Sequence, residues 1–144
     1  TGRVADGAPL FAAPRFFRQE AAGVKFGALS TPVAVDWDGD GVLDLLIGVG
    51  PQHGAPYPGS YVLFAKNVGS NAAPVFRRPA VLLFDTDGSP LGFWRHGAHM
   101  APVDWDGDGK PDLLLGAEDG FFYHLPHDEA REYPAKARTA RKPK

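Results

Sequence analysis

Two nine-residue stretches crowd aspartates together at the same spacing. Residues 36–44 read DWDGDGVLD and residues 104–112 read DWDGDGKPD, so each carries an acid at its first, third, fifth and ninth position. Carboxylates this close repel one another, and without a counter-charge they destabilise the chain or take up protons. Because the two copies agree at seven of nine positions, the pattern predicts a cation at the centre of each stretch.

The ligand types indicate which cation this is. Ca²⁺ takes about six to eight oxygen ligands, and Mg²⁺ prefers a smaller octahedral shell with several waters. Zn²⁺ favours His and Cys, which neither stretch contains. We therefore predict two Ca²⁺ sites, each with three monodentate carboxylates, one backbone carbonyl and one bidentate carboxylate. The ligands are Asp36, Asp38, Asp40, Val42 (by its carbonyl) and Asp44 in the first stretch, and Asp104, Asp106, Asp108, Lys110 (by its carbonyl) and Asp112 in the second.

An EF-hand is the rival interpretation of this spacing. It needs a Glu at the twelfth position of the loop and a helix on either side. The twelfth positions here are Ile47 and Leu115, in apolar segments that read as strands. The sequence therefore excludes an EF-hand. In the loop that remains, Gly39 and Gly41 let the chain fold around an ion, because glycine adopts positive φ without steric cost.

The segments that must position these acids read as short strands. Their apolar runs are bounded by Gly and Pro and are too short for helices. The expected strands of the first half are residues 33–35, 44–47, 60–66 and 79–84. The LLIG of residues 45–48 returns as LLLG at residues 113–116, at the spacing of the acidic stretches. We therefore predict an all-β chain of two four-stranded units, a pattern that suggests β-propeller blades.

Trp37 and Trp105 share the second position of the two stretches. Alternation with the predicted ligands points both side chains away from the ion. We predict that both pack between neighbouring sheets, and the alternative is an exposed platform on which a sugar stacks.

The string D-x-D-G-D-G-x-x-D followed by L-L-I/L-G resembles the FG-GAP, or VCBS-type, repeat of integrin-like β-propellers. Residues 67–76 (NVGSNAAPVF) and 118–120 (EDG) are also similar to bacterial versions of that repeat. The resemblance covers most of residues 13–125 and implies that the acidic loop joins two strands of a blade and binds Ca²⁺ through the eight aspartates named above. Within residues 1–125, it divides the chain into repeats at about 13–72 and 73–125.

Two blades cannot close a ring, and their open edges would invite further pairing. We therefore expect either a fragment of a larger propeller or a unit that assembles with further blades, from the parent chain or from other copies.

Composition narrows the classes of function. The chain has no Cys, which excludes disulfides and thiolate metal sites, and it has no apolar run long enough to span a membrane. Residues 131–144 hold six Lys or Arg and one Glu, so the net charge of −2 divides into +5 there and −7 over residues 1–130. We predict a basic C-terminal tail at residues 126–144 without strands, and an acidic body that argues against nucleic acid.

The first hypothesis of function is a Ca²⁺-binding module of an exported bacterial-type protein. It would mediate binding or structural interaction, with a protein or carbohydrate as ligand. Even weak extracellular sites are occupied at about millimolar Ca²⁺. This occupancy, together with the resemblance, predicts an extracellular, periplasmic or cell-surface location.

The second hypothesis is part of a polysaccharide lyase or another carbohydrate-active enzyme with a propeller fold. The insert at residues 50–59 carries His53 and Tyr57 as a possible base and acid, and Arg95 would lie near the substrate. His96 with His99 is a further candidate pair for a catalytic or metal role. A Pro-rich insert is typical of a surface loop, and no nucleophile motif accompanies it. We therefore assign no catalytic residue and favour the first hypothesis.

Overall fold

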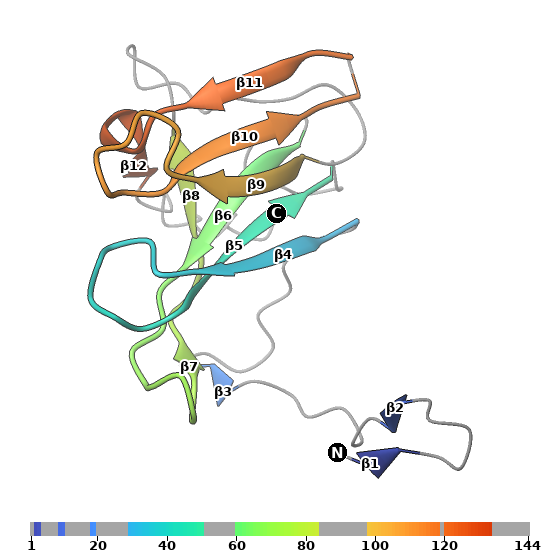
Figure 1. The fold of residues 1–144 in the computed structure, drawn as a ribbon, viewed down its shortest axis with the longest axis vertical. Coiled ribbons are helices and arrows are strands. Elements are labelled where there is room, and N and C mark those ends of the chain that lie inside the picture. The colour runs from blue at the N-terminus through green and yellow to red at the C-terminus, as the bar shows by residue number, and fades with distance from the viewer. Residues whose placement is uncertain are drawn as a thin grey trace, which may run out of the picture.

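The computed structural model describes residues 2–3, 9–10, 18–19, 29–50, 60–83, 98–118 and 120–133. Within these ranges every regular element is a β-strand, apart from a single turn of 3-10 helix, η1, at His127–Glu129 (Figure 1). The predicted all-β class is therefore confirmed. None of the helical structure in the described ranges has the length and apolar character needed to cross a bilayer.

The described strands form two principal sheets and two small pairings. The larger sheet has the order β12-β8-β6-β5-β4, and the smaller sheet has the order β11-β10-β9. β1 pairs with β2, and β3 pairs in parallel with β7. The bounds are β1 Gly2–Arg3, β2 Pro9–Leu10, β3 Arg18–Gln19, β4 Thr31–Val35, β5 Asp44–Val49, β6 Tyr61–Ala65, β7 Val75–Phe76, β8 Ala80–Leu83, β9 His99–Val103, β10 Asp112–Gly116, β11 Phe122–Leu125 and β12 Arg131–Tyr133.

The four strands expected in the first half are present as β4, β5, β6 and β8, with ends shifted by one or two residues. The second half departs from the expectation of a second four-stranded unit. Its described residues supply β9, β10 and β11, and β12 joins the edge of the larger sheet beside β8. The two principal sheets thus hold five and three strands, and the expectation of no strand in residues 126–144 is wrong at β12.

Local sequence explains which strands lie inside and which lie at an edge. The central strands β5 and β6 are apolar apart from Asp44 at the start of β5, and they are almost wholly buried, as expected for strands covered on both faces. β4 and β9 are edge strands, and each contains a proline, Pro32 and Pro102. Proline has no N–H to donate to a neighbouring strand, so it is tolerated at an edge.

The strands β4, β5 and β6 of the larger sheet pair in the same register as β9, β10 and β11 of the smaller sheet. Gly48 of β5 lies opposite Thr31 and Val62, and Gly116 of β10 lies opposite His99 and Phe122. The equivalence extends along β4-β5-β6 and β9-β10-β11. Each sheet therefore places residues of matching position on matching faces.

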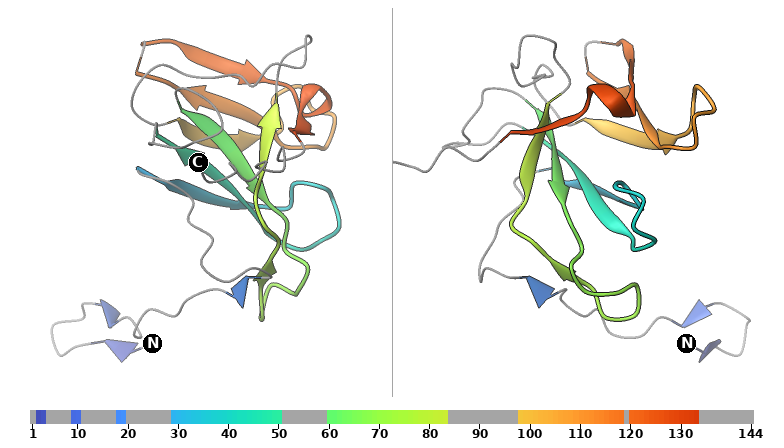
Figure 2. Two further views of the ribbon diagram at one scale, coloured as in Figure 1. Left: turned by 180° about the vertical axis from the view of Figure 1, so that it is seen from behind. Right: turned by 90° about the vertical axis from the view of Figure 1, so that its left-hand side faces the viewer.

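The main core lies between the sheets (Figure 2). It is formed by one face of the larger sheet and one face of the smaller sheet. Its buried members are Trp37, Leu46, Val62, Phe64, Leu82, Ala98, Leu113, Leu115 and Leu125. A second buried cluster lies on the opposite face of the larger sheet, with Ile47, Val49, Tyr61, Leu63, Ala65, Phe76 and Val81. The larger sheet is therefore buried on both faces.

Close contact between the sheets depends on one glycine. A Cβ atom built on Gly48 would lie 1.9 Å from the carbonyl oxygen of Ala98, which no side chain could tolerate. The hydroxyl of Thr31 donates a hydrogen bond to the same oxygen at 2.9 Å. The backbone before β9 thus rests directly on β5.

Candidate metal centres in the acidic loops

Each acidic stretch forms the loop of a β-hairpin. The first loop, residues 36–43, joins β4 to β5, and the second loop, residues 104–111, joins β9 to β10. Both loops project from the same side of the molecule, the left side in Figure 1. Gly39 and Gly41 have φ of 74° and 83°, as predicted, and the second loop repeats this at Gly107 and Gly109, with φ of 78° and 89°.

Three aspartates of each loop come together. In the first loop, Asp36, Asp38 and Asp40 each offer an oxygen, and these oxygens all lie within 4.8 Å of one another. Asp104, Asp106 and Asp108 form the matching group in the second loop. Carboxylate oxygens are the donors that Ca²⁺ prefers, so the donor set of both groups fits the predicted ion.

Backbone amides shape both loops from within. The carboxylate of Asp36 accepts hydrogen bonds from the N–H groups of Asp40 and Gly41, at 3.0 and 2.9 Å. Asp104 accepts from the N–H groups of Gly107 and Gly109, at 2.8 and 3.1 Å. The first aspartate therefore holds its loop closed through hydrogen bonds from backbone N–H groups three to five residues further along.

The two residues predicted to supply carbonyl ligands, Val42 and Lys110, are bonded through their N–H groups to the fifth-position aspartates. The N–H of Val42 donates to Asp40, and the N–H of Lys110 donates to Asp108. The predicted role of the two carbonyls as ligands stays a prediction.

The ninth aspartates stand apart from these groups. Asp44 is fully buried, and its carboxylate accepts hydrogen bonds from the N–H groups of Trp37 at 3.3 Å and Asn67 at 2.7 Å. Asp112 is also buried and accepts from the N–H groups of Trp105 at 3.2 Å and His127 at 2.8 Å. Each ties the start of its loop to a distant segment, and bidentate metal binding by these two residues stays a prediction.

The two buried carboxylates have opposite pKa shifts. Burial raises the pKa of Asp44, and the N–H groups that it accepts from do not cancel this effect. Burial also acts to raise the pKa of Asp112, but the hydrogen bonds from His124 and from the His127 N–H outweigh it, so the net shift is downward. The Nε2 atom of His124 lies 3.0 Å from Asp112.

A lysine lies against the first loop. The ammonium group of Lys66 forms ion pairs with Asp38 and, at 3.0 Å, with Asp40. The hydrogen bond from Lys66 lowers the pKa of Asp40, and those to Asp38 and Asp40 raise the pKa of Lys66. This cation already offsets part of the repulsion from which the sequence predicted a metal ion.

The lysine of the second loop is directed elsewhere. Lys110 binds Asp128 at 2.5 Å and lies 3.6 Å from Asp108. The hydrogen bond with Lys110 lowers the pKa of Asp128, and the same bond raises the pKa of Lys110. Its charge is therefore shared with an acid outside the loop.

Sequence reasoning missed the residues that brace the loops from outside. The amide oxygen of Asn71 accepts from the N–H of Leu43 at 2.7 Å, and the amide nitrogen of Asn67 donates to the carbonyl of Leu43 at 3.1 Å. In the sequence, residues 67–76 stand out only by their similarity to bacterial versions of the repeat, and it is the pairing of β5 with β6 that brings Asn67 and Asn71 to the loop. His124 and His127 had no predicted role, and they brace Asp112.

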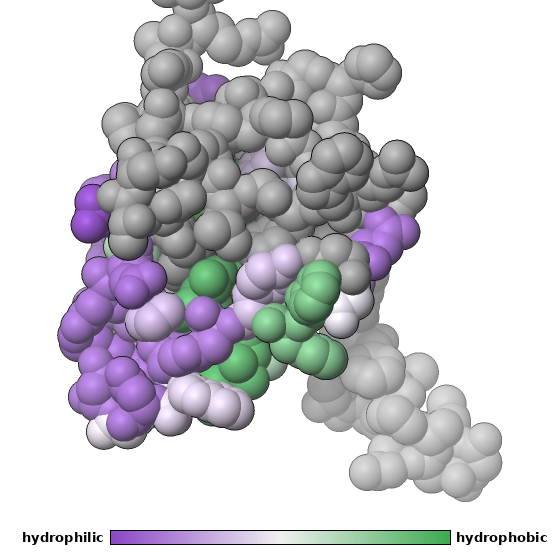
Figure 3. All heavy atoms as spheres, turned by 90° about the horizontal axis from the view of Figure 1, so that it is seen from above, coloured by the Kyte–Doolittle hydropathy of each residue, from purple (hydrophilic) through white to green (hydrophobic). Residues whose placement is uncertain are grey.

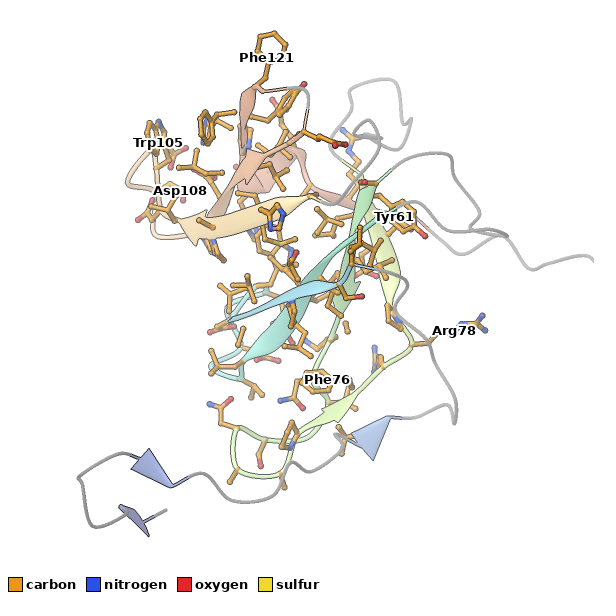
Figure 4. The ribbon with its side chains drawn as sticks, turned by 90° about the vertical axis from the view of Figure 1, so that its right-hand side faces the viewer. Tyr61, Phe76, Arg78, Trp105, Asp108 and Phe121 are labelled. Atoms are coloured by element: carbon orange, nitrogen blue, oxygen red, sulfur yellow. The ribbon has the colours of Figure 1, made fainter. Side chains whose placement is uncertain are left out.

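The two tryptophans have different surroundings. Trp37 is 6% exposed and belongs to the core between the sheets, where its ring lies 4.4 Å from that of His127. Its predicted packing role is therefore confirmed. Trp105 is 60% exposed, with its ring 5.7 Å from that of His124, so the same prediction is wrong for Trp105 within this chain. Figure 4 shows Trp105 at the outer end of the second loop, near Asp108.

Of the residues considered for catalysis, the described structure includes His99. His53, Tyr57, Arg95 and His96 lie outside the described residues. His99 is exposed at the start of β9.

No family model, no curated protein and no solved structure matches the chain. The FG-GAP or VCBS-type resemblance therefore stays a prediction.

Proposed function

We propose that this chain is a Ca²⁺-binding β-propeller module of the FG-GAP or VCBS type. The observation that carries the proposal is the convergence of three carboxylates in each of two hairpin loops that follow strands of the same register. An ion in each loop would hold the ends of two neighbouring strands together. The protein would use the stiffened sheets to bind a protein or carbohydrate partner or to connect parts of a larger assembly.

The packing of the sheets supports the propeller part of the proposal. Blades of a propeller stack around a centre, so an inner blade is covered on both faces. The larger sheet is buried on both faces, and the smaller sheet packs against one of them with the face that carries Leu113 and Leu115. Further blades, from the parent chain or from other copies, would complete the ring.

The location follows from the affinity that such loops would have. Exposed loops of extracellular modules bind Ca²⁺ with dissociation constants of about 10⁻⁴–10⁻³ M. Such sites fill outside the cell, where Ca²⁺ is about millimolar, and stay empty in the cytosol. We therefore propose an extracellular, periplasmic or cell-surface protein.

Thermal unfolding with and without calcium tests the metal. At about 1 mM Ca²⁺, a site with a dissociation constant of about 0.1 mM would stabilise the folded state by about 1.4 kcal/mol. Asp38→Asn and Asp106→Asn, at the third position of either loop, should each remove one of two contributions. Glu129→Gln, at an exposed acid outside both groups, is the matched control and should keep both. Identical melting temperatures in calcium and in chelator would remove the metal from the proposal.

A further inference from the structure

The side chain of Asn71 bonds the first acidic loop at two points. Asn71 lies in the turn that follows β6, and this turn comes beside the loop (Figure 1). Its amide oxygen accepts a hydrogen bond from the N–H of Leu43 at 2.7 Å, and its amide nitrogen donates to the carbonyl of Gly41 at 3.3 Å. Asn71 therefore holds the two peptide groups on either side of Val42, the residue whose carbonyl is a predicted ligand.

These two bonds orient the carbonyl of Val42. In a trans peptide group, the C=O and the N–H point in opposite directions. The Leu43 N–H points to Asn71, so the Val42 carbonyl of the same peptide group points away from Asn71. The preceding peptide group shows what lies on that side, since its carbonyl binds Asn71 while its N–H donates to Asp40 at 2.9 Å. The side away from Asn71 is therefore the side of the clustered carboxylates.

The second loop fixes the equivalent peptide group by a different means. Pro111 stands where the first loop has Leu43, and proline has no N–H for a side chain to hold. The ring of Pro111 instead restricts its own φ and the conformation of the residue before it, Lys110. The Lys110 N–H donates to the fifth-position aspartate at 2.8 Å, as the equivalent N–H does in the first loop. The two loops thus form the same hydrogen bond, one with a side chain from a distant turn and the other with a ring in its own backbone.

Another part of the support is alike in the two loops. The carbonyl of Leu43 accepts from the amide nitrogen of Asn67 at 3.1 Å. The carbonyl of Pro111 likewise lies 3.1 Å from Nδ1 of His127. The backbone N–H groups of Asn67 and His127 also donate to the ninth aspartates of their loops, at 2.7 and 2.8 Å. Asn67 and His127 therefore occupy equivalent places, and the loops differ at Asn71.

We propose that Asn71 is a positioning residue of the first Ca²⁺ site and that it directs the carbonyl of Val42 toward the ion. The inference rests on the proposed Ca²⁺ function and adds to it a residue from outside the loop. Without Asn71, the Val42 peptide group can turn, and a water molecule takes the place of the carbonyl. Hydrophilic residues gather on the side of the molecule from which the loops project (Figure 3), so water has access to the site.

The Ca²⁺ affinity of the first loop tests the inference, in a chain whose second loop is disabled by Asp106→Asn. In that chain, Asn71→Ala should weaken Ca²⁺ binding in a calorimetric titration roughly tenfold or more, as when other residues that orient metal ligands are replaced. Ser70→Ala is the matched control in the same exposed turn. The Ser70 hydroxyl accepts from the Ala73 N–H at 3.1 Å, within the turn itself, so this substitution should leave the affinity unchanged.

A rescue variant separates the orientation of the peptide group from general support of the loop. Leu43→Pro, added to Asn71→Ala, copies the second loop, in which a ring orients the peptide group. The Leu43 side chain is exposed, so its replacement removes little packing. The double variant should recover most of the lost Ca²⁺ affinity, although it restores neither hydrogen bond of Asn71.

Luminescence of Tb³⁺ bound in place of Ca²⁺ gives a measurement that a purely structural role would not change. The difference in its decay rate between H₂O and D₂O reports how many water molecules are bound to the ion. Asn71→Ala should raise this number by about one, because water replaces one oxygen ligand of the ion. Adding Leu43→Pro should lower it again, and Ser70→Ala should leave it unchanged.

Three results would count against the inference, and they can be told apart. If Asn71→Ala changes Ca²⁺ affinity no more than Ser70→Ala does, Asn71 orients no ligand, although the first loop binds Ca²⁺. If Asn71→Ala weakens binding with an unchanged number of waters and without rescue by Leu43→Pro, Asn71 only stabilises the turn. If the Asp106→Asn chain binds no Ca²⁺ at all, the proposed metal of the first loop is wrong and the inference falls with it.

Discussion

The two acidic loops share seven of nine residues but lie in different surroundings. The first loop is supported by its own chain: Trp37 is buried, Lys66 binds two of the acids, and Asn67 and Asn71 bond to the backbone of the loop. The second loop is open, with Trp105 exposed and Lys110 drawn toward Asp128. The motif sets the shape of each loop, and the neighbouring segments set its charge and burial.

This difference suggests different roles for the same motif. The negative charge of the first loop is offset by groups of its own chain, so the folding of this loop depends less on a bound ion. The second loop has fewer such partners, and its three clustered acids, Asp104, Asp106 and Asp108, are all exposed. We expect the structure of the second loop to depend more on Ca²⁺ than that of the first loop does.

The largest expected contrast is between the tryptophans. Trp37→Ala should destabilise the protein by about 3–5 kcal/mol, because it leaves a cavity between the sheets. Trp105→Ala should change stability by no more than about 0.5 kcal/mol, as at other surface positions. Denaturant unfolding of both variants measures the difference. Equal losses would mean that Trp105 is buried in the protein as it occurs in solution, and the comparison of the loops would fail.

The ninth aspartates should give the next largest effect. Asp112→Asn replaces an acceptor of two N–H groups and of the His124 bond, so we expect a loss of about 3 kcal/mol. Asp44→Asn should lower the free energy of unfolding by about 2 kcal/mol. The amide directs an N–H toward a backbone donor, which destabilises the fold. The substitution also removes a buried charge, which offsets part of that loss. Unfolding in chelator measures both. A larger loss for Asp44→Asn would show that its partners, not those of Asp112, hold the tighter anchor.

The opposite pKa shifts of these residues predict opposite effects of pH. The pKa of Asp44 is raised above 3.8 in the folded state, so ionisation of this carboxyl favours unfolding. The contribution of Asp44 to the free energy of unfolding therefore falls as the pH rises above 3.8. The pKa of Asp112 is lowered, so its contribution is present above 3.8 and is lost as the pH falls through the folded value.

Stability measured across the acid range in chelator should separate the two. Compared with the unsubstituted protein, Asp44→Asn should remove a decline in the free energy of unfolding toward neutral pH. Asp112→Asn should remove a decline in the free energy of unfolding toward acidic pH. If both variants changed the profile in the same direction, one of the two shifts would have the wrong sign.

Part of this site could be predicted from the sequence because it is local. The grouping of Asp36, Asp38 and Asp40 follows from alternation within a tight loop, and the positive φ of Gly39 and Gly41 follows from the lack of a Cβ atom. The strands next to the loops follow from apolar runs bounded by Gly and Pro.

The rest depends on contacts between distant segments. Lys66 lies 28 residues from Asp38 along the chain and reaches it only because β6 pairs with β5. The bond from His127 to Asp112 and the position of β12 beside β8 depend on how the chain continues after β11. The different burial of the two tryptophans depends on which face of each sheet is covered, and two identical motifs carry no such information.

The lysines should give the smallest effects and the sharpest comparison of the loops. Lys66 must leave Asp38 and Asp40 before an ion can use both oxygens, so Lys66→Met should raise the Ca²⁺ affinity of the first loop roughly tenfold, a usual size for coupling between two ligands. Lys110→Met should raise the affinity of the second loop by less, because the Lys110 ammonium lies nearer to Asp128 than to Asp108. Calorimetric titration resolves the loops when the first is measured in an Asp106→Asn background and the second in an Asp38→Asn background. If Lys66→Met weakened Ca²⁺ binding, Lys66 would be organising the first loop for calcium instead of competing with it. The first loop would then be the site of higher Ca²⁺ affinity.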